Sequence, residues 1–158
     1  MTSLPATVRL RRVVDADVDV FYEQQADAEA SAMAVFPSRD RAAFDEHWRR
    51  IRANDSGMIR TIDADGEVAG YVLSWEADGR RYLGYWLGRE FWGRGLATAA
   101  LAEYVEQLPQ RPLHAWVARS NVGSVRVLEK CGFELVEERA EHDEHAGRVV
   151  PELLFELR

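Results

Sequence analysis

Two glycines separated by one residue, Gly93 and Gly95, have the clearest chemical meaning in this sequence. Glycine lacks a Cβ atom, so a turn built from it can adopt positive φ angles and lets a ligand approach the backbone closely. Residues 82–87 before the turn read as a strand, and a helical pattern with no acidic residue in its first turn follows. The unpaired amides at a helix start and the helix dipole attract anions. The sequence therefore predicts a phosphate-binding turn.

The residues around the two glycines exclude two common types of phosphate-binding motif. No Gly-Lys-Ser/Thr follows them, so the turn is not a P-loop. The third glycine of a dinucleotide fingerprint is missing, and no N-terminal βαβ unit carries the turn. A binding module for another nucleotide stays open as an alternative at this point.

A second motif follows about one strand crossover downstream, at residues 121–133. It reads Asn-x-x-Ser-x-x-x-Leu-Glu-Lys-x-Gly-Phe, after the Trp-Gly-Arg-Gly-Leu-Ala-Thr of residues 92–98. The pair resembles the GNAT superfamily of acetyl-CoA-dependent N-acetyltransferases. Within that superfamily, the chain resembles the branch that contains the ribosomal-protein alanine N-acetyltransferases, for which the Tyr-Trp-Leu-Gly of residues 85–88 is typical. Where the family often has Gln or Arg, this chain has Trp92, which leaves a backbone cradle intact.

The resemblance implies a site for acetyl-CoA as cosubstrate, without a metal. The pyrophosphate would lie on the turn amides, and the pantetheine would pair with the edge of strand 82–87 like an added strand. Strands 82–87 and 113–118 would then splay apart where the acetyl group enters. The cofactor-binding residues that it implies are Tyr85, Trp86, Leu87, Trp92, Gly93, Arg94, Gly95, Ala97, Thr98, Asn121 and Ser124.

Catalysis of acetyl transfer needs an oxyanion donor, a proton for the departing thiolate and a neutral amine. The resemblance offers a backbone N–H near residues 86–87 as the donor and Ser124 as the candidate general acid. Many family members place a glutamate on the central strand, but residues 82–87 contain none. Glu76, His114 and a water chain are the alternatives for the general base.

Several of these residues also have a purely structural interpretation. Asn121 is a good helix N-cap for a helix that contains Ser124 three residues later. Arg126 and Lys130 are expected to be helix-surface charges, and Cys131 a small buried side chain. The run His-Asp-Glu-His at 142–145 is expected to be a solvated loop between the last two strands.

Composition limits the function further. A length of 158 residues suggests one domain, and a net charge of −7 argues against a general nucleic-acid binder. No apolar run is long enough to span a membrane, no secretory signal is visible, and the single cysteine fits a cytoplasmic protein. The acidic surface mildly favours a cationic acceptor.

Local signals predict several element boundaries. Asp15 or Asp17 can cap the first helix, Ser38 can open the second, and the run Asp-Ala-Asp-Gly at 63–66 is a turn signal between the two strands of a hairpin.

The hydrophobic periodicity predicts an α+β fold with the order β-α-α-β-β-β-α-β-α-β-β. The strands form a single mixed, mostly antiparallel sheet with helices on both faces, because strand–helix–strand over residues 82–118 implies one parallel crossover. We expect one N-acetyltransferase domain, 1–158. Its acceptor-side helices lie within 15–54, and Met33, Phe36, Arg39 and Trp48 are candidate lining residues there. Its acetyl-CoA-binding core is 82–133.

The function that the resemblance implies is transfer of acetyl from acetyl-CoA to a primary amine by direct attack in a ternary complex. The amine would belong to a protein N-terminus or to a small molecule, such as a polyamine or an antibiotic. Two alternatives keep the same fold: transfer of another acyl group, and a non-catalytic sensor of acyl-CoA. Dimers are common in this branch, so a homodimer is among its implications.

Overall fold

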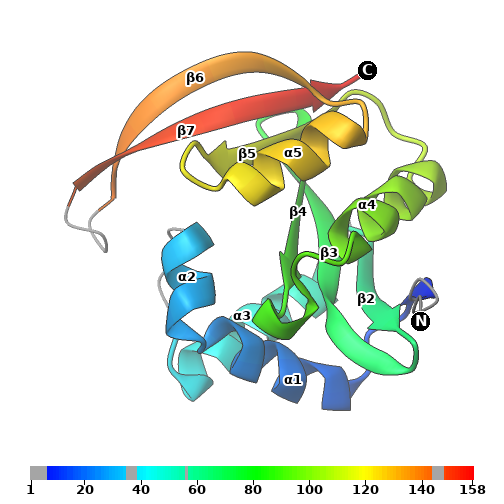
Figure 1. The fold of residues 1–158 in the computed structure, drawn as a ribbon. Helices are drawn as coiled ribbons and strands as arrows, with labels where there is room; N and C mark the ends of the chain where they lie inside the picture. The colour runs from blue at the N-terminus through cyan, green and yellow to red at the C-terminus, as the bar shows by residue number, and fades with distance from the viewer. Residues whose placement is uncertain (1–6, 35–38, 56, 144–147) are drawn as a thin grey trace, which may run out of the picture.

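The computed structural model describes residues 7–34, 39–55, 57–143 and 148–158. Its strands form one seven-stranded sheet in the order β1-β2-β3-β4-β5-β7-β6 (Figure 1). All neighbouring strands are antiparallel except β4 and β5, which are parallel. The strands are β1 Val8–Arg11, β2 Ile59–Ala64, β3 Glu67–Ala77, β4 Arg80–Leu87, β5 Leu113–Ala118, β6 Glu134–Asp143 and β7 Arg148–Leu157. The predicted α+β class and mixed sheet are confirmed.

Helices cover both faces of the sheet. Consecutive residues of a strand point to opposite faces, and on β3 Tyr71 packs against α1 and α3 whereas Val72 belongs to the core beneath α4. Phe21 and Trp48 each pack edge to face with Tyr71, with ring centroids 5.0 and 4.7 Å from that of Tyr71. The helical elements are α1 Asp15–Gln25, α2 Ala28–Ala34, α3 Arg41–Ala53, the 3-10 turn η1 Arg89–Phe91, α4 Leu96–Gln107 and α5 Val122–Lys130.

The helix starts differ from the sequence expectation. Helix α2 was not predicted; the Asp27 carboxylate accepts hydrogen bonds from the Glu29 and Ala30 amides and so holds its first turn. Helix α3 begins after Asp40, whose side chain accepts from the Ala43 amide, whereas the sequence placed the start at Ser38, outside the described residues. Asp15 and Asp17 are not the N-cap of α1, since Val14 occupies that position.

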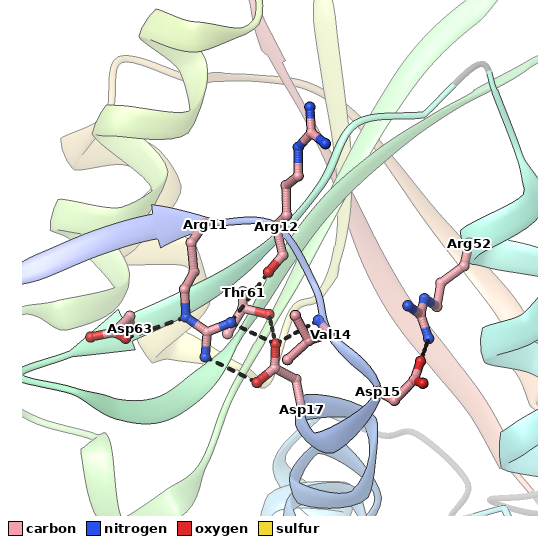
Figure 2. Close-up of polar contacts among 8 residues, drawn as sticks. All are labelled: Arg11, Arg12, Val14, Asp15, Asp17, Arg52, Thr61 and Asp63. Carbon is pink, nitrogen blue, oxygen red and sulfur yellow. Dashed lines mark hydrogen bonds and ion pairs between the residues drawn. The ribbon is translucent and has the colours of Figure 1, made fainter.

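Asp17 instead ties α1 to the sheet. Its carboxylate is 3% exposed and accepts two hydrogen bonds from the Arg11 guanidinium, at 2.8 and 3.0 Å (Figure 2). The Thr61 hydroxyl and the Val14 amide donate to it as well, at 2.8 and 2.9 Å. Burial alone would raise the pKa of Asp17, but these donors outweigh burial and hold the pKa below its usual value. One carboxylate thus joins β1, β2 and the start of α1.

None of the helices in the described part of the chain combines the length and the apolar character that a membrane span requires.

Candidate active site

The site begins where the two parallel strands separate. Strands β4 and β5 pair at Arg81 with Leu113 and at Tyr82 with His114, and the described residues show no further pairing between them (Figure 1). The remaining part of β4 therefore presents unpaired backbone groups along one edge. This confirms the splay expected between residues 82–87 and 113–118.

Two cavities lie along this separation and meet. The turn cavity, about 440 Å³, lies between the end of β4, the glycine turn and α5. The sheet cavity, about 600 Å³, lies between α3, β3, β4 and β5. The residues that line both are Ala34, Tyr85, Trp86, Asn121 and Ser124. A ligand in one cavity can therefore reach a ligand in the other at these residues.

The glycine turn has the backbone that the sequence predicted. Gly93 and Gly95 both have a φ of 74°, and Gly95 is the N-cap of α4, which has no acidic residue in its first turn. A Cβ atom at either glycine would meet nothing within 4 Å, so the space above the turn is open. The turn can therefore present amides to an anion at the positive end of the helix dipole.

Trp92 has a structural role that the sequence did not reveal. Its indole Nε1 donates to the Leu87 carbonyl at 2.9 Å, and its own amide donates to the Arg89 carbonyl at 3.1 Å. The side chain thus fastens the glycine turn to the end of β4. Trp92 lines the turn cavity, and its amide already has a partner within η1.

The predicted cofactor residues converge on the turn cavity, with one exception. All of them line it apart from Arg94, whose exposed guanidinium lies 5.7 Å from the centre of the Phe91 ring. Arg126 and Lys130, expected to be plain surface charges, also line it. The described lining residues include these two cations and no acidic side chain, so the cavity favours an anionic ligand.

Ser124 and Tyr85 form a hydroxyl pair at the junction of the cavities. The Tyr85 hydroxyl donates to Ser124 Oγ at 2.8 Å, from β4 to α5. Burial raises the pKa of Tyr85, more than the hydrogen bond to Ser124 lowers it, so the phenol keeps its proton. Asn121 caps α5 by accepting from the Ser124 amide at 3.3 Å. Capping and cavity lining therefore coexist in these residues.

The two side chains named as general bases differ in position. Glu76 lines the sheet cavity, but its carboxylate is paired with the Arg81 guanidinium at 3.0 Å. His114 is buried and lines neither cavity; its Nε2 lies 3.0 Å from Glu156 Oε2, and its ring lies 5.9 Å from that of Tyr82. Only Glu76 of the two therefore faces a cavity.

The residues expected to line the acceptor side lie in different parts of the structure. Arg39 lines the sheet cavity and Met33 the turn cavity, whereas Trp48 is 2% exposed in the core between α1, α3 and β3. Phe36 lies outside the described residues. His47 and Arg50 of α3 line the sheet cavity. From the sequence His47 is interpreted as structural and Arg50 is not named, because their spacing matches any solvated helix face.

Two remaining predictions concern Cys131 and the run at 142–145. The Cys131 thiol is half-buried, lies 3.6 Å from the Thr98 carbonyl oxygen, and has its pKa raised by burial, which fits a packing role. His142 and Asp143 end β6 and are not part of a loop, while residues 144 and 145 lie outside the described residues. The described residues contain no cluster of three or more His, Cys, Asp or Glu able to hold a metal ion.

Known proteins resemble this chain in sequence and in fold. An uncharacterized N-acetyltransferase, p20 of Bacillus licheniformis, is 24% identical over 161 residues, which is 94% of this chain and 90% of p20. The spermidine N-acetyltransferase of Vibrio cholerae, solved with CoA and spermine, superposes with a TM-score of 0.83 at 14% identity, covering 95% and 94% of the two chains. RimJ of Mycobacterium smegmatis, solved with CoA-disulfide, superposes with a TM-score of 0.79 at 21% identity, covering 95% of this chain and 81% of RimJ.

The family model for the acetyltransferase (GNAT) domain matches residues 7–134, which contain the glycine turn, the hydroxyl pair and most of the sheet. This match confirms the resemblance drawn from the two motifs, and the chain belongs to the GNAT acetyltransferase family.

Proposed function

We propose that this enzyme transfers the acetyl group of acetyl-CoA to a primary amine while both substrates are bound. One observation carries the proposal: a cavity whose described charged lining residues are two cations meets a second, separately lined cavity at Tyr85, Trp86, Asn121 and Ser124. The turn cavity would hold acetyl-CoA, and the sheet cavity would hold the acceptor. Direct attack needs such a junction, because the amine must reach the thioester carbonyl.

The cosubstrate would be bound by backbone and by two cations. The space above Gly93 and Gly95 is open, and the backbone amides of these glycines and of the first turn of α4 would bind the pyrophosphate there. Arg126 and Lys130 would add charge to the same ligand. The pantetheine amides would pair with the free edge of β4, as an added strand does. The proposed binding of acetyl-CoA thus uses the amides of the glycine turn and the unpaired edge of β4.

The chemical step would occur beside the hydroxyl pair. The amine nitrogen attacks the thioester carbonyl, the new C–N bond forms, and the C–S bond breaks to release a thiolate. A β4 amide near residues 86–87 would stabilise the oxyanion. Ser124, which accepts a hydrogen bond from Tyr85 and so has its own proton free to point elsewhere, would protonate the thiolate. The amine proton would leave through solvent along the wall of the sheet cavity that contains Glu76.

The acceptor would be a protein N-terminus or a small-molecule amine. A protein of this fold is named a spermidine N-acetyltransferase, and another is RimL, described as an alpha-N-protein acetyltransferase of ribosomal L7/L12. Both kinds of acceptor place a primary amine at the end of a flexible chain.

An amine panel tests the proposal against the sensor alternative. Acetyl-CoA is mixed with the enzyme and with N-terminal peptides, polyamines or aminoglycosides, and the free thiol of CoA is measured. We expect CoA release that depends on both an amine and the enzyme. Tight acetyl-CoA binding without release for any amine would favour the non-catalytic sensor, and release from longer acyl-CoAs alone would favour another acyl group.

A further inference from the structure

The sheet cavity contains a charge pattern that the overall acidity of the chain does not suggest. Its charged lining residues are Arg39 and Arg50 from the segment around α3, and Glu76 from β3. Arg50 pairs with Glu46 at 3.2 Å, but Glu46 also pairs with Arg49, so these three side chains together keep one positive charge. Glu76 is the one acidic side chain among the described lining residues, and its carboxylate is paired with Arg81 at 3.0 Å. Positive charge is therefore in excess where the acceptor would lie, although the whole chain carries −7.

Arg39 is held in place by a buried neighbour. The Gln25 side chain, 4% exposed, donates to the Arg39 carbonyl at 3.2 Å and accepts from the Arg39 amide at 3.1 Å. This double hydrogen bond fixes the backbone of Arg39 beside the cavity, and the residue is half-buried. A positioned, partly desolvated arginine binds carboxylate or phosphate better than a mobile surface lysine does.

The charges of the arginines act on the pKa values of two neighbouring side chains, His47 and Tyr71. The pKa of His47, another lining residue, is lowered first by burial and then by the charges of Arg39 and Arg50. Burial raises the pKa of Tyr71 to about 12, against an opposing effect of Arg39. His47 therefore stays neutral at neutral pH, and the positive potential of the cavity comes from the arginines.

We infer that the acceptor amine carries an anionic group, a carboxylate or a phosphate, which Arg39 and Arg50 bind in the sheet cavity. The inference rests on the proposed function, because it assigns the acceptor to that cavity. A polyamine has no anionic group, and the lining offers it a single carboxylate that Arg81 already neutralises. The structure thus favours an acidic acceptor over the cationic one that the acidic composition suggested.

The test compares acceptors of different charge. Three tripeptides with a free N-terminal alanine, followed by two glutamates, two glutamines or two lysines, are measured with spermidine and with free amino acids, using CoA release. Because lysine side chains carry amines of their own, mass spectrometry identifies the acetylated nitrogen of each peptide. We expect kcat/KM for the glutamate peptide to exceed that for the lysine peptide about tenfold. Free amino acids separate the two sources of a carboxylate, the acceptor's own terminus and an acidic side chain. Added salt should shrink the ratio.

Variants assign the preference to the two arginines. Arg39→Gln keeps both hydrogen bonds to the Gln25 side chain, because these use only the backbone atoms of residue 39. It should reduce the ratio of kcat/KM for the glutamate peptide to that for the lysine peptide several-fold, through KM. Arg50→Gln should do so too. Arg49→Gln is the matched control, because Arg49 is on the same helix and pairs with the same Glu46 but does not line the sheet cavity.

Three results would overturn the inference. These are a preference for spermidine or the lysine peptide, equal rates for all three peptides, or a glutamate preference that survives in both Arg39→Gln and Arg50→Gln. Absence of CoA release with every acceptor would instead remove the transferase activity itself, so the two failures are distinguishable.

Discussion

At the scale of single residues, the proposed reaction would depend on the hydroxyl pair at the junction of the two cavities. Ser124 can be substituted without loss of its helix cap, because Asn121 accepts from the Ser124 amide and not from its hydroxyl. Tyr85 lines both cavities and its hydroxyl donates to Ser124, so in the proposed reaction it borders the ligands and also holds Ser124. The two hydroxyls should therefore affect turnover more than binding.

Ser124→Ala should lower kcat about 100-fold while leaving KM for acetyl-CoA nearly unchanged, because it removes the proton donor for the thiolate. Tyr85→Phe should lower kcat by roughly tenfold, since Ser124 is still present but no longer held. Ser120→Ala is the matched control, an exposed serine near the start of the same helix. Unchanged turnover in Ser124→Ala would remove that residue from the mechanism.

A second residue-scale prediction concerns the buried carboxylate that ties α1 to the sheet. Asp17→Asn should lower the free energy of unfolding by about 3 kcal/mol, because it leaves the Arg11 guanidinium without its buried partner. Asp15→Asn is the control: that carboxylate is 95% exposed and pairs with Arg52 at 2.7 Å (Figure 2), and exposed pairs contribute little. Denaturant titration measures both, and equal effects would contradict the role of Asp17.

The pH dependence of that difference follows from the lowered pKa of Asp17 in the folded state. A carboxyl with a lowered folded-state pKa contributes stability above its unfolded value, near 3.8, and the contribution is lost as pH falls through the folded value. The gap between wild type and Asp17→Asn should therefore be constant at neutral pH and narrow below about pH 4. A gap that widens in acid would contradict this assignment.

At the scale of elements, the site depends on how the glycine turn is attached. The turn is fastened to β4 by Trp92 and begins α4 at Gly95, where a positive φ favours glycine. The open space above it is where the phosphates would lie. A side chain at Gly95 would thus strain the turn and project into the ligand.

Gly95→Ala should weaken acetyl-CoA binding about tenfold and lower the free energy of unfolding by about 1 kcal/mol. Gly79→Ala is a close control, since its φ is 75°, its Cβ also meets nothing within 4 Å, and it lies in the β3–β4 turn away from both cavities. It should show the same loss of stability with unchanged affinity. Equal effects on affinity would show that the turn acts through folding alone.

The sequence predicted the elements with strong local signals and missed those that depend on distant contacts. The hairpin at Asp65 and Gly66, the glycine turn and the α5 cap follow from local turn chemistry. Helix α2 has seven residues, too few to be stable alone. It is held to η1 by Arg89, which pairs with Asp27 and Glu29 about sixty positions earlier. No local pattern reveals such a pairing.

At the scale of the whole molecule, overall charge and local charge point in opposite directions. The chain carries −7, yet the described lining of the turn cavity has no acid and that of the sheet cavity has one, already paired. Composition could predict the first property but not the second, because only the fold decides which side chains face a cavity. His47, Arg50 and Lys130 were missed or discounted for this reason.

Every step of the proposed reaction requires that acetyl-CoA binds the folded protein, and thermal unfolding with added ligand tests this binding most directly. A ligand that binds only the folded protein stabilises it by about 2.7 kcal/mol at one hundred times its Kd, which corresponds to a rise of about 5–10 °C in Tm. We expect that rise with acetyl-CoA, and little change with NAD or ATP at the same concentration. An unchanged Tm with acetyl-CoA would contradict the account.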